Sequence, residues 1–125
     1  MVAASAPGLR LYSYGACSTC RRALKWLADH SISFEVIDIT LQPPAEAELR
    51  AALKQLGRGR LFNTSGQSYR ALGGATIKAY SDDQAIVALA ADGKLIKRPF
   101  LVTPEGAVLT GFQPAEWIEL LIPGA

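Results

Sequence analysis

Two cysteines, Cys17 and Cys20, stand where an extended apolar run changes into a helical pattern, and they are the only cysteines of the chain. Residues 11–14 are typical of a strand, and apolar side chains return at helical spacing over residues 22–28. This change of period predicts a strand that turns directly into a helix. Cys17 is then expected at or just before the helix N-terminus, and Cys20 in the first turn.

The predicted helix start favours the ionised form of a cysteine. Ser18 or Thr19 is a favourable N-cap residue there. The unpaired N–H groups and the positive end of the helix dipole stabilise a thiolate relative to a thiol. Arg21 and Arg22 add positive charge at the same place. These surroundings indicate a reactive sulfur at Cys17.

The chain is long enough for one packed domain. It has 125 residues, of which 50% are hydrophobic and 19% charged, and its net charge is +2. The charges form no block typical of a nucleic-acid binder, and the apolar runs are too short to span a membrane. Residues 1–8 are typical of a flexible tail and lack the features of a signal peptide. We therefore expect a monomeric, cytoplasmic protein with neither nucleic acid nor a membrane as a partner.

In a reducing compartment, a C-x-x-C pair is more often catalytic, redox-sensing or half of a metal site than a structural disulfide. A structural zinc site needs four ligands, and the chain adds only His30 to its two cysteines. We therefore expect no metal. The alternative of two inert cysteines fits poorly with their position at a helix start.

Strand and helix patterns follow one another in the order β-α-β, then helices, then β-β-α. The strand–helix–strand unit implies two parallel neighbouring strands, and residues 100–112 form a hairpin with a loop of the three-residue class. With the C-x-x-C pair at the first strand-to-helix turn, this order predicts a thioredoxin-like α/β fold. We expect one domain over residues 9–125, with a four-stranded mixed sheet and a helical insertion around residues 44–92. The predicted strands are 9–14, 34–39, 100–103 and 107–112. The first predicted helix is opened by the cysteine turn, with Ser18 or Thr19 as its N-cap, and ends near residue 30. The other predicted helices are 44–56 with Pro44 at its first position, 67–72 stopped by Gly73 and Gly74, 82–91 capped by Ser81, and 114–121.

Several segments, in chain order, carry a resemblance to a known family. These segments are 14–27, 62–66, 69–70, 72–73, 95–99 and 108–112. Together they resemble the arsenate reductase/Spx (ArsC-like) family of thioredoxin-fold proteins over roughly residues 9–121.

The resemblance implies roles for individual residues. Cys17 matches the nucleophile of the family, Arg98 its anion-binding arginine, and Pro99 a cis-proline beside the active cysteine. A guanidinium beside a thiolate lowers the thiol pKa and can hold an oxyanion or a glutathione carboxylate. Taken alone, Arg98 is also compatible with a surface arginine ahead of a strand.

The same resemblance extends the site and shows where the chain departs from the family. Ser18, Thr19 and Asn63 are implied as further substrate-binding residues. The glutathione-linked arsenate reductases use two additional arginines, and this chain has Asn63 at one of those positions and no arginine over 107–110 at the other. Since a charge-assisted hydrogen bond contributes about 1.5–3 kcal/mol, we expect weakened arsenate binding.

The resemblance and the residues together predict a thiol–disulfide oxidoreductase. Cys17 attacks a small or protein disulfide, and Cys20 resolves the mixed disulfide through an intramolecular bond. No bound cofactor is expected, and glutathione, thioredoxin or glutaredoxin is the expected reductant. Two alternatives stay open: an Spx-like redox-switched regulator that binds the α-subunit of RNA polymerase, and an arsenate reductase linked to glutathione and glutaredoxin.

Overall fold

Four strands form one mixed sheet in the computed structural model, which describes residues 8–124. The sheet order is β2-β1-β3-β4; β1 runs parallel to β2 and antiparallel to β3, and β3 runs antiparallel to β4. The predicted mixed sheet is therefore confirmed. Residues 1–7 of the predicted tail and Ala125 lie outside the described residues. The strands are β1 (Leu9–Ser13), β2 (Phe34–Asp38), β3 (Phe100–Val102) and β4 (Val108–Thr110).

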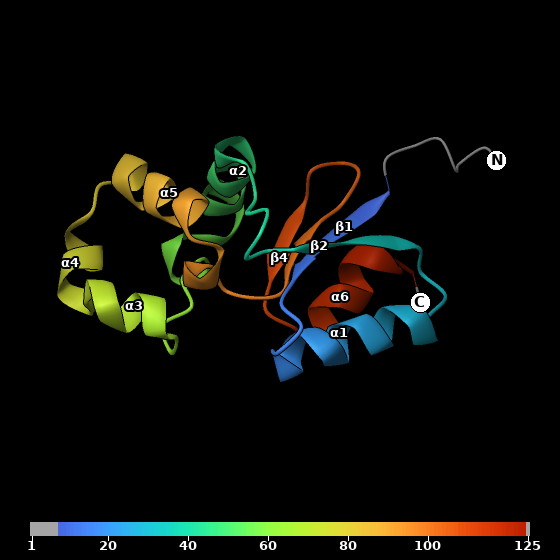
Figure 1. Cartoon of the computed structure of the whole chain (residues 1–125). Helices are drawn as coiled ribbons and strands as arrows, with labels where there is room; N and C mark the ends of the chain where they lie inside the picture. The colour runs from blue at the N-terminus through green and yellow to red at the C-terminus, as the bar shows by residue number, and fades with distance from the viewer. Residues whose placement is uncertain (1–7, 125) are drawn as a thin grey trace.

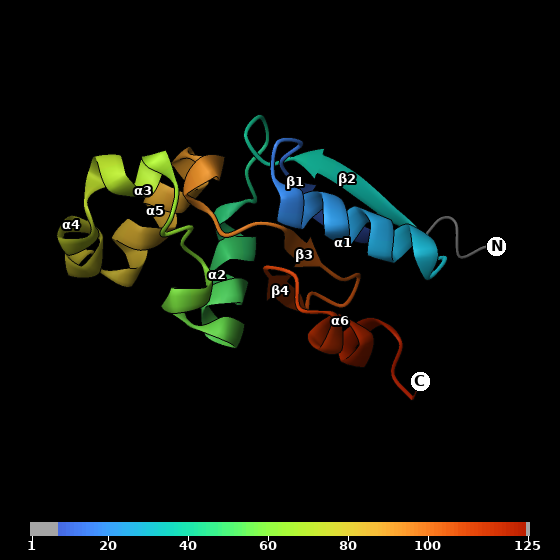
Figure 2. The same cartoon turned by 90° about the horizontal axis from the view of Figure 1, so that it is seen from below.

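Helices cover both faces of the sheet, and three of them extend away from it (Figure 1). Helices α1 and α6 lie together on one side, whereas α2 lies on the other (Figure 2). Helices α2, α3, α4 and α5 make up the predicted insertion, in which α2 packs against both β4 and α5. The helices are α1 (Ser18–Asp29), α2 (Glu46–Leu56), α3 (Gln67–Leu72), α4 (Gly74–Ala79), α5 (Asp82–Ala91) and α6 (Pro114–Leu121), with short 3-10 turns η2 (Arg58–Arg60) and η3 (Gly93–Leu95).

Alternation along the strands divides the core into two layers. Leu11 and Leu101 are fully buried in one cluster with Trp117 of α6. Tyr12 and Phe100, one position away on each strand, lie in the other cluster. Because successive strand residues point to opposite faces, this period of two places α1 and α6 against one face and α2 against the other.

Two predicted helix starts are wrong. The N-cap of α1 is Cys17, with extended backbone angles and no side-chain cap, so that Ser18 and Thr19 are already helical. Helix α2 begins at Glu46, because Pro44 is buried ahead of the helix and Ala45 is still extended. The predicted helix over residues 67–72 is confirmed as α3, which ends at Gly73 with φ +90°. A further helix that the sequence did not predict, α4, begins at Gly74.

Two other predicted end signals are confirmed, whereas β4, at Val108–Thr110, is shorter than the predicted strand 107–112. Ser81 caps α5 in a reciprocal box with Gln84, each side chain bonded to the other residue's backbone N–H. The β3–β4 hairpin closes a three-residue loop, in which the Thr103 N–H donates to the Ala107 carbonyl at 2.9 Å. Gly106 adopts φ +88° in this loop, a conformation that glycine reaches without steric cost. The short hairpin sets β4 beside β3 and leaves residues 110–113 at the edge of the site.

Candidate active site

The strand-to-helix turn positions the two cysteines differently. The Cys17 N–H donates to the Tyr14 carbonyl at 3.0 Å, and the Cys17 carbonyl accepts from the Arg21 N–H at 3.1 Å. Cys17 is half-buried, whereas Cys20 is fully buried, and both carry free thiols. The Tyr14 N–H donates to the Cys20 sulfur at 3.4 Å. One sulfur therefore opens to the outside and the other lies in the core beneath it, as the predicted helix start implies.

Arg98 approaches Cys17 from the segment before β3. The Arg98–Pro99 bond is cis, as expected. One terminal nitrogen of Arg98 donates to the Lys94 carbonyl at 3.1 Å, and the guanidinium carbon lies 5.1 Å from the centre of the Tyr14 ring. The Nε atom is buried and has no hydrogen-bond partner among the described residues. Arg98 is therefore built into the site, which argues against the alternative of a surface arginine.

The surroundings shift the two thiols in opposite directions. Burial opposes ionisation of Cys17, but the backbone N–H and the thiol of Cys20, the Arg98 side chain and the Thr19 N–H outweigh it and lower the pKa of Cys17. Burial raises the pKa of Cys20, which also faces the thiolate of Cys17. The pair therefore has one sulfur suited to attack and one that stays protonated until the first reacts.

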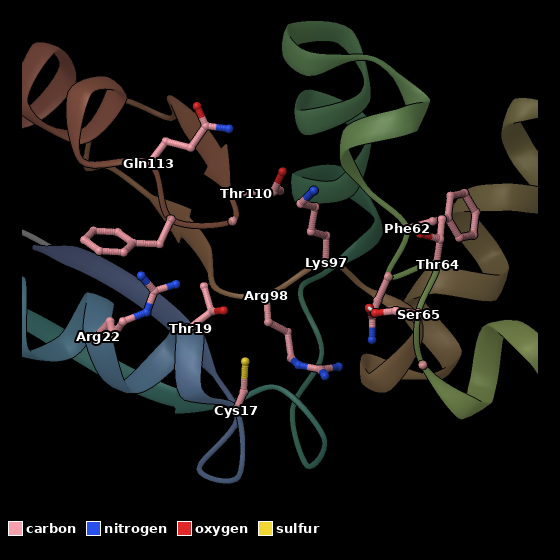
Figure 3. A pocket seen from close by; sticks show the side chains of 14 residues that line it. Cys17, Thr19, Arg22, Phe62, Thr64, Ser65, Lys97, Arg98, Thr110 and Gln113 are labelled. Atoms are coloured by element: carbon pink, nitrogen blue, oxygen red, sulfur yellow. Dashed lines mark hydrogen bonds between the residues drawn. The ribbon is translucent and has the colours of Figure 1, made fainter.

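The Cys17 sulfur faces a pocket of about 550 Å³ (Figure 3). Three cations line it, Arg22, Lys97 and Arg98, and none of the described residues in its wall is a carboxylate. The wall comes from α1, the segment between η2 and α3, the approach to β3 and the end of β4. Its further residues are Thr19, Phe62, Asn63, Thr64, Ser65, Gly66, Thr110, Gly111, Phe112 and Gln113. The pocket is therefore suited to an anionic ligand.

The structure brings together some of the residues that the sequence indicates and separates others. Of the predicted substrate-binding residues, Thr19 and Asn63 line the pocket. Ser18 is exposed and Pro99 is buried, and neither is part of the pocket wall. Cys20 is fully buried and is also not part of the wall. The wall thus joins residues from both halves of the chain.

Backbone bonds hold the Asn63 segment against the approach to β3. The Asn63 N–H donates to the Leu95 carbonyl at 2.8 Å, and the Lys97 N–H to the Leu61 carbonyl at 2.8 Å. A bridge pairs Phe62 with Ile96 between them. This short antiparallel contact ties the insertion to the site.

Sequence reasoning missed Lys97 and Gln113 as pocket residues. Lys97 stands next to Arg98 in the matching segment, and this pair of basic residues was the available signal. Gln113 follows the β4 strand and lines the same pocket as Cys17 only through the sheet order, in which β3 lies between β1 and β4. No spacing along the chain indicates that contact.

Fold and site together define a class of protein: a thioredoxin-fold protein with a cysteine pair at the first strand-to-helix turn and an arginine before a cis-proline. The chain belongs to the ArsC family, whose family model matches residues 12–120. Within residues 8–124, the helices include none of the length and apolar character that crossing a membrane requires.

Three relatives and one solved structure show the range of this family. The protein YusI of Bacillus subtilis is 42% identical, covering 89% of this chain and 96% of its own. The regulatory protein MgsR of the same organism is 29% identical (90% and 89%), and an arsenate reductase of Escherichia coli is 30% identical (94% and 82%). A crystal structure from Streptococcus mutans, described as that of a possible arsenate reductase, has a TM-score of 0.79 and 45% identity, covering 86% of this chain and 92% of that one. The family thus includes proteins named as reductases and one named as a regulator.

Proposed function

We propose that the protein is a thiol–disulfide oxidoreductase with Cys17 as the nucleophile and Cys20 as the resolving cysteine. The observation that supports it most strongly is the contrast between the two sulfurs. Cys17 lies at the N-cap of α1 in a cationic pocket, with its pKa lowered. Cys20, three residues later in the first turn of the same helix, is fully buried. Nucleophilic attack needs an accessible sulfur that ionises easily, and release of the bound substrate needs a second thiol close to the first.

The proposed reaction transfers two electrons from the protein to the substrate. The Cys17 thiolate attacks one sulfur of a substrate disulfide, the S–S bond breaks, and the leaving sulfur takes a proton as a thiol. Cys20 then loses its proton and attacks the Cys17 sulfur, which releases the second substrate thiol. The protein ends with a Cys17–Cys20 disulfide and the substrate is fully reduced.

An external thiol must return the protein to its reduced form. The cationic pocket favours an anionic thiol, and glutathione, with two carboxylates, has that chemistry. A thioredoxin or glutaredoxin is the macromolecular alternative. These reductants act under the reducing conditions of the cytoplasm, and we expect the reaction to take place there.

Trapping the mixed disulfide tests this proposal. Cys20→Ser keeps the attacking sulfur but cannot resolve, so it should accumulate a covalent adduct with a disulfide substrate, which mass spectrometry detects. The matched control, Cys17→Ser, should form no adduct although it keeps the other cysteine. Equal adduct formation by the two variants would refute the assigned roles.

A second candidate is a redox-switched regulator, because the chain is similar to MgsR over nearly its whole length. In this role the same disulfide would change binding to a partner such as the α-subunit of RNA polymerase. A pull-down with that subunit, using reduced and oxidised protein, separates the two functions. Binding in neither redox state would eliminate the second candidate.

A further inference from the structure

Tyr14 lies between β1 and the cysteine turn, and its ring meets two cations. The guanidinium carbon of Arg98 is 5.1 Å from the ring centre, and the Lys94 ammonium nitrogen is 5.6 Å from it. The ring is half-buried at the edge of the larger core cluster. Both distances are within the range in which a cation is attracted to the negative face of an aromatic ring.

Arg98 has few other attachments that would fix its orientation. One nitrogen donates to the Lys94 carbonyl, the Nε atom is buried without a partner, and within residues 8–124 no carboxylate forms an ion pair with this guanidinium. An arginine without a carboxylate partner is free to hold an anion, but it needs a neutral support to stay in place. The Tyr14 ring provides that support without neutralising the charge.

We propose that Tyr14 is a positioning residue whose ring holds the Arg98 guanidinium beside the Cys17 sulfur. The inference rests on the proposed function, since it concerns the activation of the same nucleophile. It adds a specific cause: without the ring, Arg98 has only the Lys94 carbonyl to orient it, and the guanidinium spends less time near the thiolate.

The backbone of Tyr14 makes the test selective. Its N–H donates to the Cys20 sulfur, and its carbonyl accepts from the Cys17 N–H. A side-chain replacement leaves both backbone groups in place. The other charged or ionisable groups near Cys17 are Cys20, Arg21, whose guanidinium donates to the Gly15 carbonyl in the same turn, and the pocket cations Arg22 and Lys97. The Lys94 ammonium nitrogen lies 5.6 Å from the centre of the Tyr14 ring. All of these remain in a Tyr14 variant.

The experiment compares iodoacetamide alkylation of Cys17 as a function of pH in the intact chain. Tyr14→Leu should raise the apparent pKa of Cys17 and slow alkylation at pH 6 about threefold or more, a change in the range of a cation–π contact. Tyr14→Phe keeps the ring face and should stay within about twofold of the parent rate. Tyr14→Gln, a polar variant for this half-buried position, repeats the test should Tyr14→Leu fail to fold by circular dichroism.

A double-mutant cycle with Arg98→Leu separates positioning from a general structural effect. Tyr14→Leu should no longer slow the alkylation of Cys17 when Arg98 is already replaced, because the ring then has no guanidinium to hold. An unchanged profile for Tyr14→Leu and Tyr14→Gln, or an equal loss in the Arg98→Leu background, overturns the proposal. A parent protein that alkylates like a free thiol of pKa about 8.5 would instead count against the proposed function itself.

Discussion

The backbone N–H of Tyr14 donates to the sulfur of Cys20 across 3.4 Å, and this bond joins the last residue before the turn to the first turn of α1. It holds the Cys20 sulfur against the end of β1, under the cysteine that faces the pocket. The two sulfurs of the pair therefore differ in access as well as in acidity. An external reagent can therefore reach the Cys17 sulfur but not the buried Cys20 sulfur.

Alkylation should consequently follow a fixed order. In the reduced native protein we expect iodoacetamide to modify Cys17 rapidly and Cys20 only after unfolding, because the Cys20 side chain is fully buried. Peptide mapping after a short labelling pulse, with and without denaturant, gives the order directly. Native Cys17→Ser should take up almost no label; rapid labelling of Cys20 in that variant would contradict the burial.

Ionisation of Tyr12 should lower the stability of the folded protein at alkaline pH. Burial, together with a hydrogen bond from its hydroxyl to Glu48, raises the pKa of Tyr12 to about 12. Because the folded state holds this proton more tightly than the unfolded chain, the stabilisation is complete below pH 10 and is lost as pH rises toward 12. The loss should reach about 1 kcal/mol by pH 11. Urea unfolding at pH 9 and pH 11 measures it.

Tyr12→Phe is the matched control for this alkaline effect. It removes the titrating hydroxyl but keeps the ring, which packs edge-on against Phe100 with 5.8 Å between the ring centres. The variant should be less stable than the parent at pH 9 and should show a smaller further loss at pH 11. Parallel losses in the two proteins would assign the effect to other groups.

The sequence was a good guide to elements whose signals are local. Period-two and helical patterns located all four strands and five of the helices, because burial on one face imposes those periods. The cysteine pair located the site, since its position relative to the strand and helix is set by only a few residues. The N-cap residue was predicted wrongly, because residue-type preference favours Ser18 or Thr19. In the structure Cys17 is the N-cap and makes no side-chain cap bond.

The parts that sequence could not supply depend on distant contacts. Helix α4 was missed because a Gly-Gly pair normally ends a helix, whereas here the first glycine alone makes the turn. Gln113 joins the pocket through the strand order, and the meeting of Arg98 with the Tyr14 ring requires β1 and β3 to be neighbours. Such contacts leave no periodic trace in the chain.

Gly93 should be among the least replaceable residues outside the site. A Cβ atom there would lie 1.8 Å from the Ile39 carbonyl oxygen, a backbone atom that cannot rotate away. Gly93→Ala must therefore move either η3 or the turn after β2, and we expect a loss of about 1–3 kcal/mol or more in urea unfolding. Gly59→Ala is the control, since nothing lies within 4 Å of its Cβ position; equal stabilities of the two variants would contradict the close contact.

Arsenate should be a poor substrate. The glutathione-linked arsenate reductases use two arginines besides the one that Arg98 matches, and this chain has Asn63 at one of those positions and no arginine over 107–110 at the other. A compact oxyanion at the sulfur therefore lacks both of these guanidinium donors. We expect arsenate turnover coupled to glutathione and glutaredoxin to stay at the level of Cys17→Ser. Turnover well above that control would restore arsenate reduction as the function.

The remaining pocket cations should select larger anions. Arg22, whose guanidinium lies 5.9 Å from the Phe112 ring centre, and Lys97 line the pocket, and neither is among the leading causes of the lowered pKa of Cys17. Arg22→Gln and Lys97→Gln should each raise the KM for oxidised glutathione about three- to tenfold, as expected for a partly solvated ionic contact. The kcat and the apparent pKa of Cys17 should not change.

An uncharged disulfide, bis(2-hydroxyethyl) disulfide, provides the control for this selectivity. It presents the same S–S bond without carboxylates, so its KM should be the same in the parent protein and in both variants. Added salt should weaken glutathione disulfide binding in the parent more than in the variants, because screening acts on the contacts that the variants lack. If both disulfides lost affinity equally, Arg22 and Lys97 would be supporting the shape of the pocket and not its preference for charge.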